Sequence, residues 1–86
     1  MEGVECNDNM ITSLDLHLQV SLITIECDDN LLTYLNIQNG NNIALTWFSA
    51  EDNPNLFCVQ VDNVSYANTN FTTAIDSQAE FSTNCQ

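Results

Sequence analysis

Apolar residues recur along the chain with a period of a little over twenty residues. The stretch LITIECDDNLLTYLNI, residues 22–37, has the form L-x-x-I-x-C-x-x-N-x-L-x-x-L-x-I. Residues 1–16 match it with a shift of 21 residues, and residues 45–61 match it with a shift of 23 up to Asn53 and of 24 after one inserted residue. A fixed period of this length is typical of a solenoid, in which stacked repeats share one continuous core.

Seven positions of this form are apolar or asparagine in every copy. They are Met1, Val4, Cys6, Asn9, Ile11, Leu14 and Leu16, then Leu22, Ile25, Cys27, Asn30, Leu32, Leu35 and Ile37, then Leu45, Phe48, Ala50, Asn53, Leu56, Val59 and Val61. The pattern resembles the leucine-rich repeat, and more closely its short bacterial form LxxLxCxxNxLxxLDL, the IRREKO type. The resemblance covers residues 1–61, and the tail is similar to the terminal cap of secreted Bacteroidetes repeat proteins.

The resemblance implies a mainly β fold, a leucine-rich-repeat solenoid of about three coils with parallel stacked short strands and a C-terminal cap. The expected coils span residues 1–21, 22–44 and 45–63, and the cap spans 64–86. Concave strands are expected at 3–7, 24–28 and 47–51, and second strands across each coil at 13–16, 34–37 and 58–61. Alternation along a strand then places Val4, Cys6, Ile25, Cys27, Phe48 and Ala50 inside, while Glu5, Glu26 and Ser49 face water.

One asparagine follows each concave strand, at Asn9, Asn30 and Asn53. The backbone turns inward there and leaves amide and carbonyl groups without partners. A buried polar group without a partner costs about 1–3 kcal/mol, and an asparagine side chain supplies both a donor and an acceptor. We therefore expect a structural asparagine ladder that runs from coil to coil.

The period breaks toward the C-terminus. Pro54 lacks an amide donor, and the third repeat carries its inserted residue near Asn55. From Asp62 onward the period is lost, as expected for a unit that covers the open end of a core. Within this cap we expect a short helical turn in 63–71 that packs its aromatic residues on the last coil, and an edge strand in 79–83.

Two of the four cysteines, Cys6 and Cys27, occupy the same inward position in consecutive repeats. Parallel strands lie about 4.8 Å apart, so the two Cβ atoms would be about as far apart. That distance exceeds the usual 3.5–4.5 Å of a disulfide. We interpret both residues as small buried thiols, with a strained disulfide as the alternative.

Cys58 aligns with Ser13 and Tyr34, which point away from the core, so the repeat does not explain it. Cys85 lies near the end of the tail, where a covalent link would hold the cap on the last repeat. We therefore predict a Cys58–Cys85 disulfide and, with it, an oxidising, extracellular or cell-surface location. Zinc is not expected, because there is no C-x-x-C pair and the single histidine, His17, is far from both cysteine pairs.

The composition restricts the classes of partner that the chain is expected to bind. The chain has no Lys or Arg and 12 Asp and Glu, which gives a formal charge of −12. Nucleic acid and anionic membranes need cationic contacts and are therefore not expected as partners. No stretch approaches the roughly 20 apolar residues of a membrane span, and no signal peptide begins the sequence. The first repeat starts without a cap, which suggests either a piece of a longer protein or a first coil that is uncovered.

Superposed repeats place acidic and polar residues in surface columns. The candidate recognition surface is Glu5, Asn7, Glu26, Asp28, Trp47, Ser49 and Glu51, and Asp8, Asp29 and Asp52 form a further column. An exposed indole at Trp47 beside acids suits stacking on a sugar or anchoring a partner. The alternatives are a surface that serves solubility, and a tryptophan that packs over its neighbours.

These observations favour a non-enzymatic protein- or glycan-recognition or adhesion module of an exported bacterial leucine-rich-repeat protein, without a cofactor. No nucleophile–base pair is recognisable, so catalysis is not expected. Two alternatives stay open. One is a self-associating solenoid, in which two chains meet N-terminus to N-terminus through the uncapped coil. The other is a surface module that binds Ca²⁺, although the sequence has no EF-hand or glycine–aspartate repeat loop.

Overall fold

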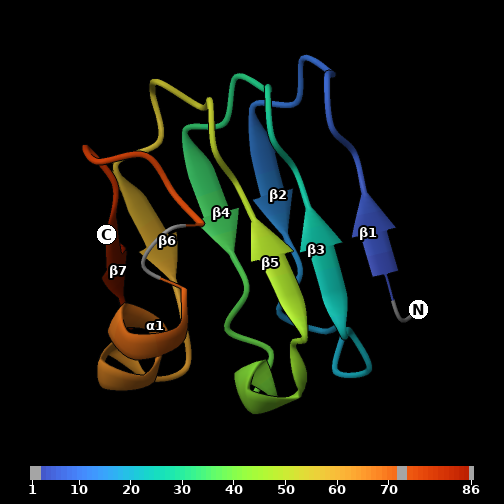
Figure 1. Cartoon of the computed structure of the whole chain (residues 1–86), viewed down its shortest axis with the longest axis vertical. Coiled ribbons are helices and arrows are strands. Elements are labelled where there is room, and N and C mark those ends of the chain that lie inside the picture. Colours follow the sequence, from blue (N-terminus) through green and yellow to red (C-terminus); the bar gives the residue numbers. More distant parts are fainter. Residues whose placement is uncertain (1–2, 72–73, 86) are drawn as a thin grey trace.

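The computed structural model describes residues 3–71 and 74–85, and the core position expected at Met1 lies outside them (Figure 1). The chain is mainly β, with seven strands and one α-helix in this part. The strands are β1 Gly3–Glu5, β2 Ser13–Asp15, β3 Thr24–Glu26, β4 Tyr34–Asn36, β5 Trp47–Ser49, β6 Cys58–Gln60 and β7 Glu80–Ser82; a 3-10 helix, η1, spans Asn42–Ala44, and α1 spans Val64–Asn70. No helix in the described residues is long and apolar enough to cross a bilayer.

The strands form two parallel sheets that lie one behind the other (Figure 1). One sheet has the order β1-β3-β5, and the other has the order β2-β4-β6-β7. The register pairs Gly3 with Thr24 and Thr24 with Trp47, at separations of 21 and 23 residues. In the second sheet Leu35 pairs with Val59, 24 residues on. The shifts read from the repeat are therefore confirmed.

The strands are shorter than expected, and in the first sheet a side chain replaces a backbone partner just beyond the strand ends. In the first sheet each strand stops after three residues, at Glu5, Glu26 and Ser49. Two residues further on, the Asp28 amide donates to the Asn7 side-chain oxygen rather than to a backbone carbonyl. The regular ladder is thus interrupted where the chain begins to turn.

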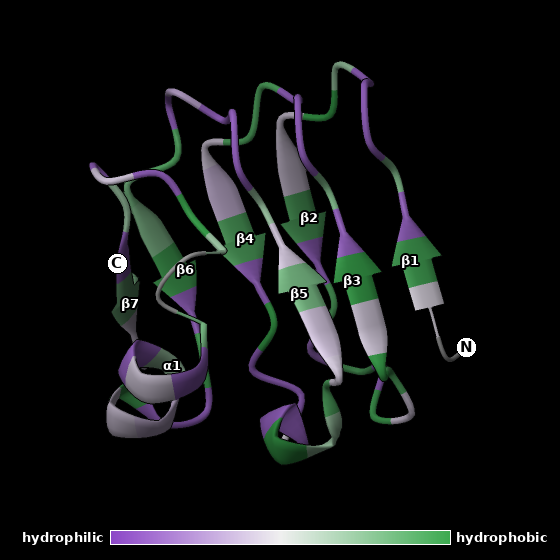
Figure 2. Ribbon diagram, viewed as in Figure 1, coloured by the Kyte–Doolittle hydropathy of each residue, from purple (hydrophilic) through white to green (hydrophobic). Residues whose placement is uncertain are grey.

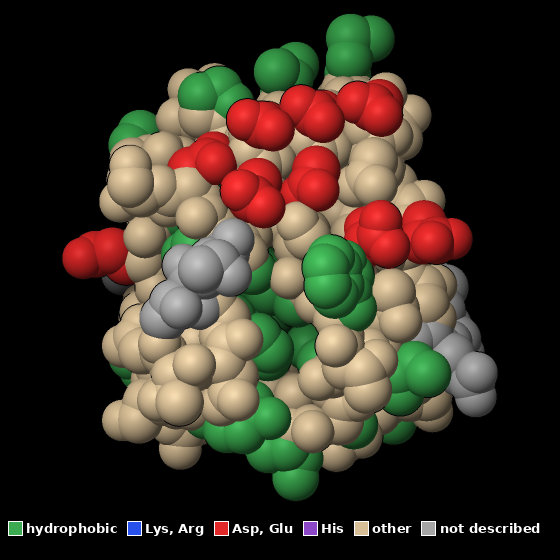
Figure 3. Space-filling model, in the orientation of Figure 1, with side chains coloured by type: hydrophobic (Ala, Val, Ile, Leu, Met, Phe, Trp, Pro, Cys, Tyr) green, Lys and Arg blue, Asp and Glu red, His purple; other side chains and the backbone are tan. Residues whose placement is uncertain are grey.

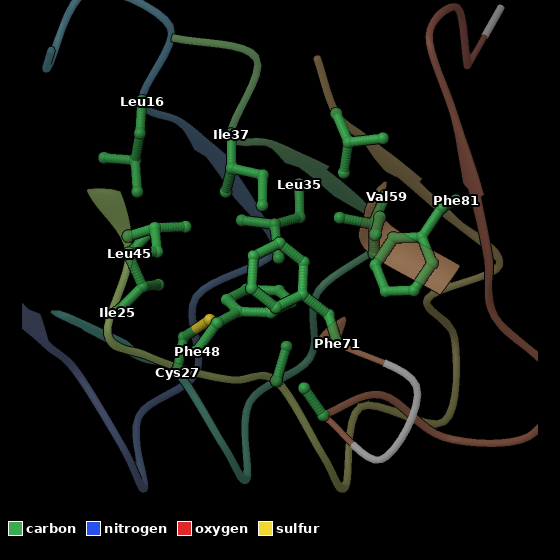
Figure 4. Packing of buried hydrophobic residues seen from close by; sticks show 14 of the residues in the cluster. Leu16, Ile25, Cys27, Leu35, Ile37, Leu45, Phe48, Val59, Phe71 and Phe81 are labelled. Carbon is green, nitrogen blue, oxygen red and sulfur yellow. The ribbon is translucent and has the colours of Figure 1, made fainter. Parts of the chain in front are cut away.

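The strands carry hydrophobic residues at their middle positions (Figure 2). The core lies between the two sheets and comes mostly from the second and third repeats (Figure 4). Its fully covered apolar side chains are Leu22, Ile25, Cys27, Leu32, Leu35, Ile37, Ala50, Val59 and Val61. The corresponding residues of the first repeat, Val4, Cys6, Ile11 and Leu14, are only partly buried. They lie at the end of the stack, where β1 and β2 each have a neighbour on one side only.

The C-terminal segment covers the other end. The helical turn expected in 63–71 is α1, which begins at the N-cap Asn63, whose side chain accepts a hydrogen bond from the Tyr66 amide. Phe71 ends the helix and packs edge-on against Phe48, with ring centroids 5.3 Å apart. β7 continues the second sheet beside β6, with Phe81 directed inward. The expected edge strand is therefore present.

The predicted disulfide is confirmed. Cys58 on β6 is bonded to Cys85, and the bond closes a loop with a sequence separation of 27 residues. Cys6 and Cys27 are free thiols. A disulfide indicates that the chain folds under oxidising conditions, as found outside the cytoplasm.

Candidate functional site

Acidic side chains gather on the face formed by β1, β3 and β5 and the turns that follow them (Figure 3). Glu5 and Glu26 are paired across neighbouring strands and stand side by side. Asp8, Asp29 and Asp52 are exposed and follow the strands at the same place in each repeat. We call this surface the acidic face; because the chain has no Lys or Arg, none of these charges is neutralised by a basic side chain.

The three exposed aspartates share an unusual backbone conformation. Asp8, Asp29 and Asp52 have φ of 59°, 56° and 59°, in the left-handed region. Aspartate tolerates this region better than most residues, because its short side chain can bond the local backbone. Loss of hydration, together with the Asp52 and Asp8 carboxylates, raises the pKa of Asp29. The turn that fixes the backbone therefore also crowds like charges into a row.

Two residues of the predicted recognition surface hold the repeats together. The Asn7 side chain accepts from the Asp28 amide at 2.7 Å and donates to the Glu26 carboxylate at 3.1 Å. One repeat later, an Asp28 carboxylate oxygen accepts from the Glu51 amide at 2.7 Å. Both side chains are half-buried, so a ligand reaches only part of each.

The expectation that Ser49 faces water is wrong. Ser49 is only 7% exposed, and its hydroxyl donates to the Asp28 carboxylate at 2.7 Å. The burial arises beyond the repeats: Ala50, the next residue, forms a parallel bridge with Ile75, so the segment after α1 lies against this end of β5. The repeat alignment carried no information about that segment.

Trp47 is exposed as predicted, with 58% of its surface open to solvent. It stands beside a cleft of about 340 Å³ between β5 and the helix α1, and Figure 3 shows an apolar floor at this place. The cleft is lined by Leu45, Thr46, Trp47, Phe48, Ser49, Glu51, Tyr66, Asn70, Phe71 and Ala74. The indole thus lies where the acidic face meets the helix.

The asparagines form hydrogen bonds between repeats. The Asn53 amide group donates to the carbonyls of Cys27, Ala50 and Glu51, and its oxygen accepts from the Leu32 amide. Asn30 makes the corresponding contacts one repeat earlier, with the carbonyls of Cys6, Cys27 and Asp28 and the amide of Ile11. Asn9 is exposed and donates only within its own repeat. Asn30 and Asn53 thus connect successive repeats.

Sequence reasoning missed the contributions of the C-terminal segment to this region. Tyr66 and Asn70 line the cleft from α1, and Asp76 accepts from the amides of Asp52 and Asn53, at 2.9 Å each. The equivalent amides of the earlier repeats, at Asp8 and Asp29, donate to a backbone carbonyl of the following repeat, so the Asp76 carboxylate takes the place of that carbonyl. No repeat signal exists there, so only the three-dimensional arrangement reveals these roles.

The described residues contain no group of three or more His, Cys, Asp or Glu side chains arranged to hold a metal ion. The site is therefore best described as an acidic face that ends in an aromatic cleft. No family model, curated protein or solved structure matches the chain.

Proposed function

We propose that this chain is a leucine-rich-repeat solenoid of about three coils with a C-terminal cap, and that it acts as a non-enzymatic recognition module of an exported protein. The parallel registers at 21, 23 and 24 residues support the solenoid, because each separation equals one repeat. The Asn30 and Asn53 hydrogen bonds support it further, since each asparagine joins two successive repeats. The disulfide supports export to an oxidising compartment.

The partner that the acidic face fits is a protein surface or peptide rich in Lys or Arg. The observation that carries this proposal is the row of exposed carboxylates over β1, β3 and β5, in a chain without any Lys or Arg. Complementary charge speeds association and selects among partners. Exposed charges contribute little each, so affinity must come from several of them acting together with an apolar anchor.

The test is titration calorimetry with hexaarginine and, as a neutral peptide, (Gly-Ser)₃, at low and high salt. Hexaarginine should bind and (Gly-Ser)₃ should not, and high salt should weaken the binding of hexaarginine. The double variant Glu5→Gln/Glu26→Gln, on the acidic face, should weaken binding about 5-fold. Asp15→Asn/Glu80→Gln removes the same charge from the other sheet and should change affinity less than about 2-fold. Equal effects of the two double variants would contradict a specific acidic face.

Self-association is the second candidate. At the β1 and β2 end of the stack, the apolar residues Val4, Cys6, Ile11 and Leu14 are only partly buried. Two chains could cover these residues by meeting at this end in a closed dimer. Light scattering of the free chain distinguishes the two functions: a dimer that persists on dilution favours self-association.

A further inference from the structure

The cleft between β5 and α1 combines aromatic walls with a carboxylate at its edge. Trp47 contributes an exposed indole from the strand, and Tyr66 faces the cleft from the helix. Phe71 forms part of the wall and is held edge-on by both Phe48 and Tyr66, at centroid distances of 5.3 and 5.8 Å. The wall is therefore formed by packed rings rather than by loose side chains.

Charge around the cleft has one sign. Glu51 lines the cleft, and its side chain is exposed. Asp28 lies next to it, because its carboxylate accepts from the Ser49 hydroxyl and the Glu51 amide. Aromatic faces attract cations through their negative π surface, and a nearby carboxylate adds to this attraction. A ligand with a cationic head and an apolar stem matches both features.

We propose that this cleft seats one arginine or lysine side chain of the partner, with its cationic group between the Trp47 ring and the Glu51 carboxylate and its alkyl stem against the aromatic wall. The inference rests on the proposed function, because it identifies the anchor of the same acidic face. The volume, about 340 Å³, is at the small end of ligand sites and suits a single long side chain. Such an anchor supplies the apolar contact that exposed charges lack.

A neutral sugar could also stack on an exposed indole. The cationic side chain is favoured because the acidic residues beside the cleft belong to a chain with a formal charge of −12 and no Lys or Arg. A neutral glycan gains nothing from that charge, whereas arginine gains both a cation–π contact and an ion pair.

The sole tryptophan of the chain lies at the cleft, so its fluorescence reports directly on occupancy. Saturating hexaarginine should change the Trp47 emission, and (Gly-Ser)₃ should not. By calorimetry, Trp47→Ala should weaken hexaarginine binding about 5-fold, because a cation–π contact with a partly exposed indole is lost. Trp47→Phe keeps an aromatic face and should recover part of this loss.

The matched variants Glu51→Gln and Glu5→Gln distinguish binding in the cleft from attraction to the acidic face as a whole. Both substitutions remove one exposed glutamate charge from the same face, but only Glu51 lines the cleft. Glu51→Gln should weaken the binding of hexaarginine at least about 3-fold more than Glu5→Gln does. The circular-dichroism spectra of both variants should stay unchanged.

The outcomes distinguish failure of the cleft from failure of the basic-partner function. If hexaarginine binds but Trp47→Ala and Glu51→Gln behave like Glu5→Gln, the cleft is not the anchor, and the basic-partner function stands. If hexaarginine does not bind at all, both proposals fail. If maltohexaose changes the Trp47 emission and hexaarginine does not, the cleft is a sugar site and the cationic anchor is overturned.

Discussion

Cys27 is a buried thiol of the core whose pKa is set by burial and by its neighbours. It is fully buried, and its sulfur donates a hydrogen bond to the Ser49 carbonyl at 3.6 Å. Burial, and then the neighbouring Cys6 and Asp28, raise the pKa of Cys27 from 9.0 to about 12. Burial also raises the pKa of Cys6. Both groups are therefore neutral thiols at physiological pH, packed as small apolar side chains.

The raised pKa predicts destabilisation at alkaline pH. Below pH 9.0 the Cys27 thiol is protonated in both the folded and the unfolded chain, so its contribution to stability is fully present. Between pH 9.0 and about 12 only the unfolded chain loses the proton, so stability falls by about 1.4 kcal/mol per pH unit. Urea unfolding at pH 8 and pH 10 measures this loss.

The control for this prediction is Cys27→Ala, which has no group to ionise. Ala50 occupies the same position in the next repeat, so the core accepts alanine there. The variant should be less stable than the native chain at pH 8 because of the lost contacts, and the difference should shrink at pH 10. A difference that stays constant would contradict the shifted pKa.

At the scale of elements, the three-residue strands carry few backbone hydrogen bonds of their own. Asparagine side chains supply the missing contacts in the turns, where they connect each strand pair to the preceding one. Asn53 is completely buried and makes four hydrogen bonds, two of them to the preceding repeat, whereas Asn9, at the end of the stack, is exposed and makes two within its own repeat. Every buried polar side-chain atom in the described residues has a partner. Position in the stack therefore decides what each asparagine contributes.

Alanine substitution along the ladder should reveal this gradient. Asn53→Ala leaves buried carbonyls and the Leu32 amide without partners, and it should lower the free energy of unfolding by about 3 kcal/mol. Asn9→Ala should cost less than about 1 kcal/mol, because water replaces the lost donor. Urea unfolding followed by circular dichroism compares the two variants. Similar losses would contradict the ladder as a buried structural element.

For the whole molecule, the repeat made the sheets predictable and the C-terminal segment did not. The pairing of Thr24 with Trp47 followed from apolar positions that must share one core. The burial of Ser49 could not be foreseen, because it depends on a segment without any repeat. The cleft depended on the same segment: Trp47 was recognisable as exposed, but Tyr66 became part of the site only through the placement of α1.

The disulfide connects the stability of the molecule to its proposed site. Cys58 and Cys85 enclose α1 and β7, so the helix that forms one wall of the cleft lies within the closed loop. A loop of 27 residues is expected to stabilise the fold by about 3 kcal/mol, because the link restricts the unfolded chain. Reduction should therefore act on both folding and binding.

Cys85→Ser should lower the free energy of unfolding by about 3 kcal/mol, and the reduced native chain should behave in the same way. Cys6→Ser is the matched control, because it also replaces a partly exposed sulfur but opens no loop. Hexaarginine should bind more weakly to Cys85→Ser than to Cys6→Ser, since α1 is then held to the sheets by non-covalent packing alone, through residues such as Ala67 and Phe71. A Cys85→Ser variant with unchanged stability and weakened binding would place the role of the disulfide in the cleft alone. Unchanged binding with lost stability would show that the cleft does not depend on the closed loop that contains its helix.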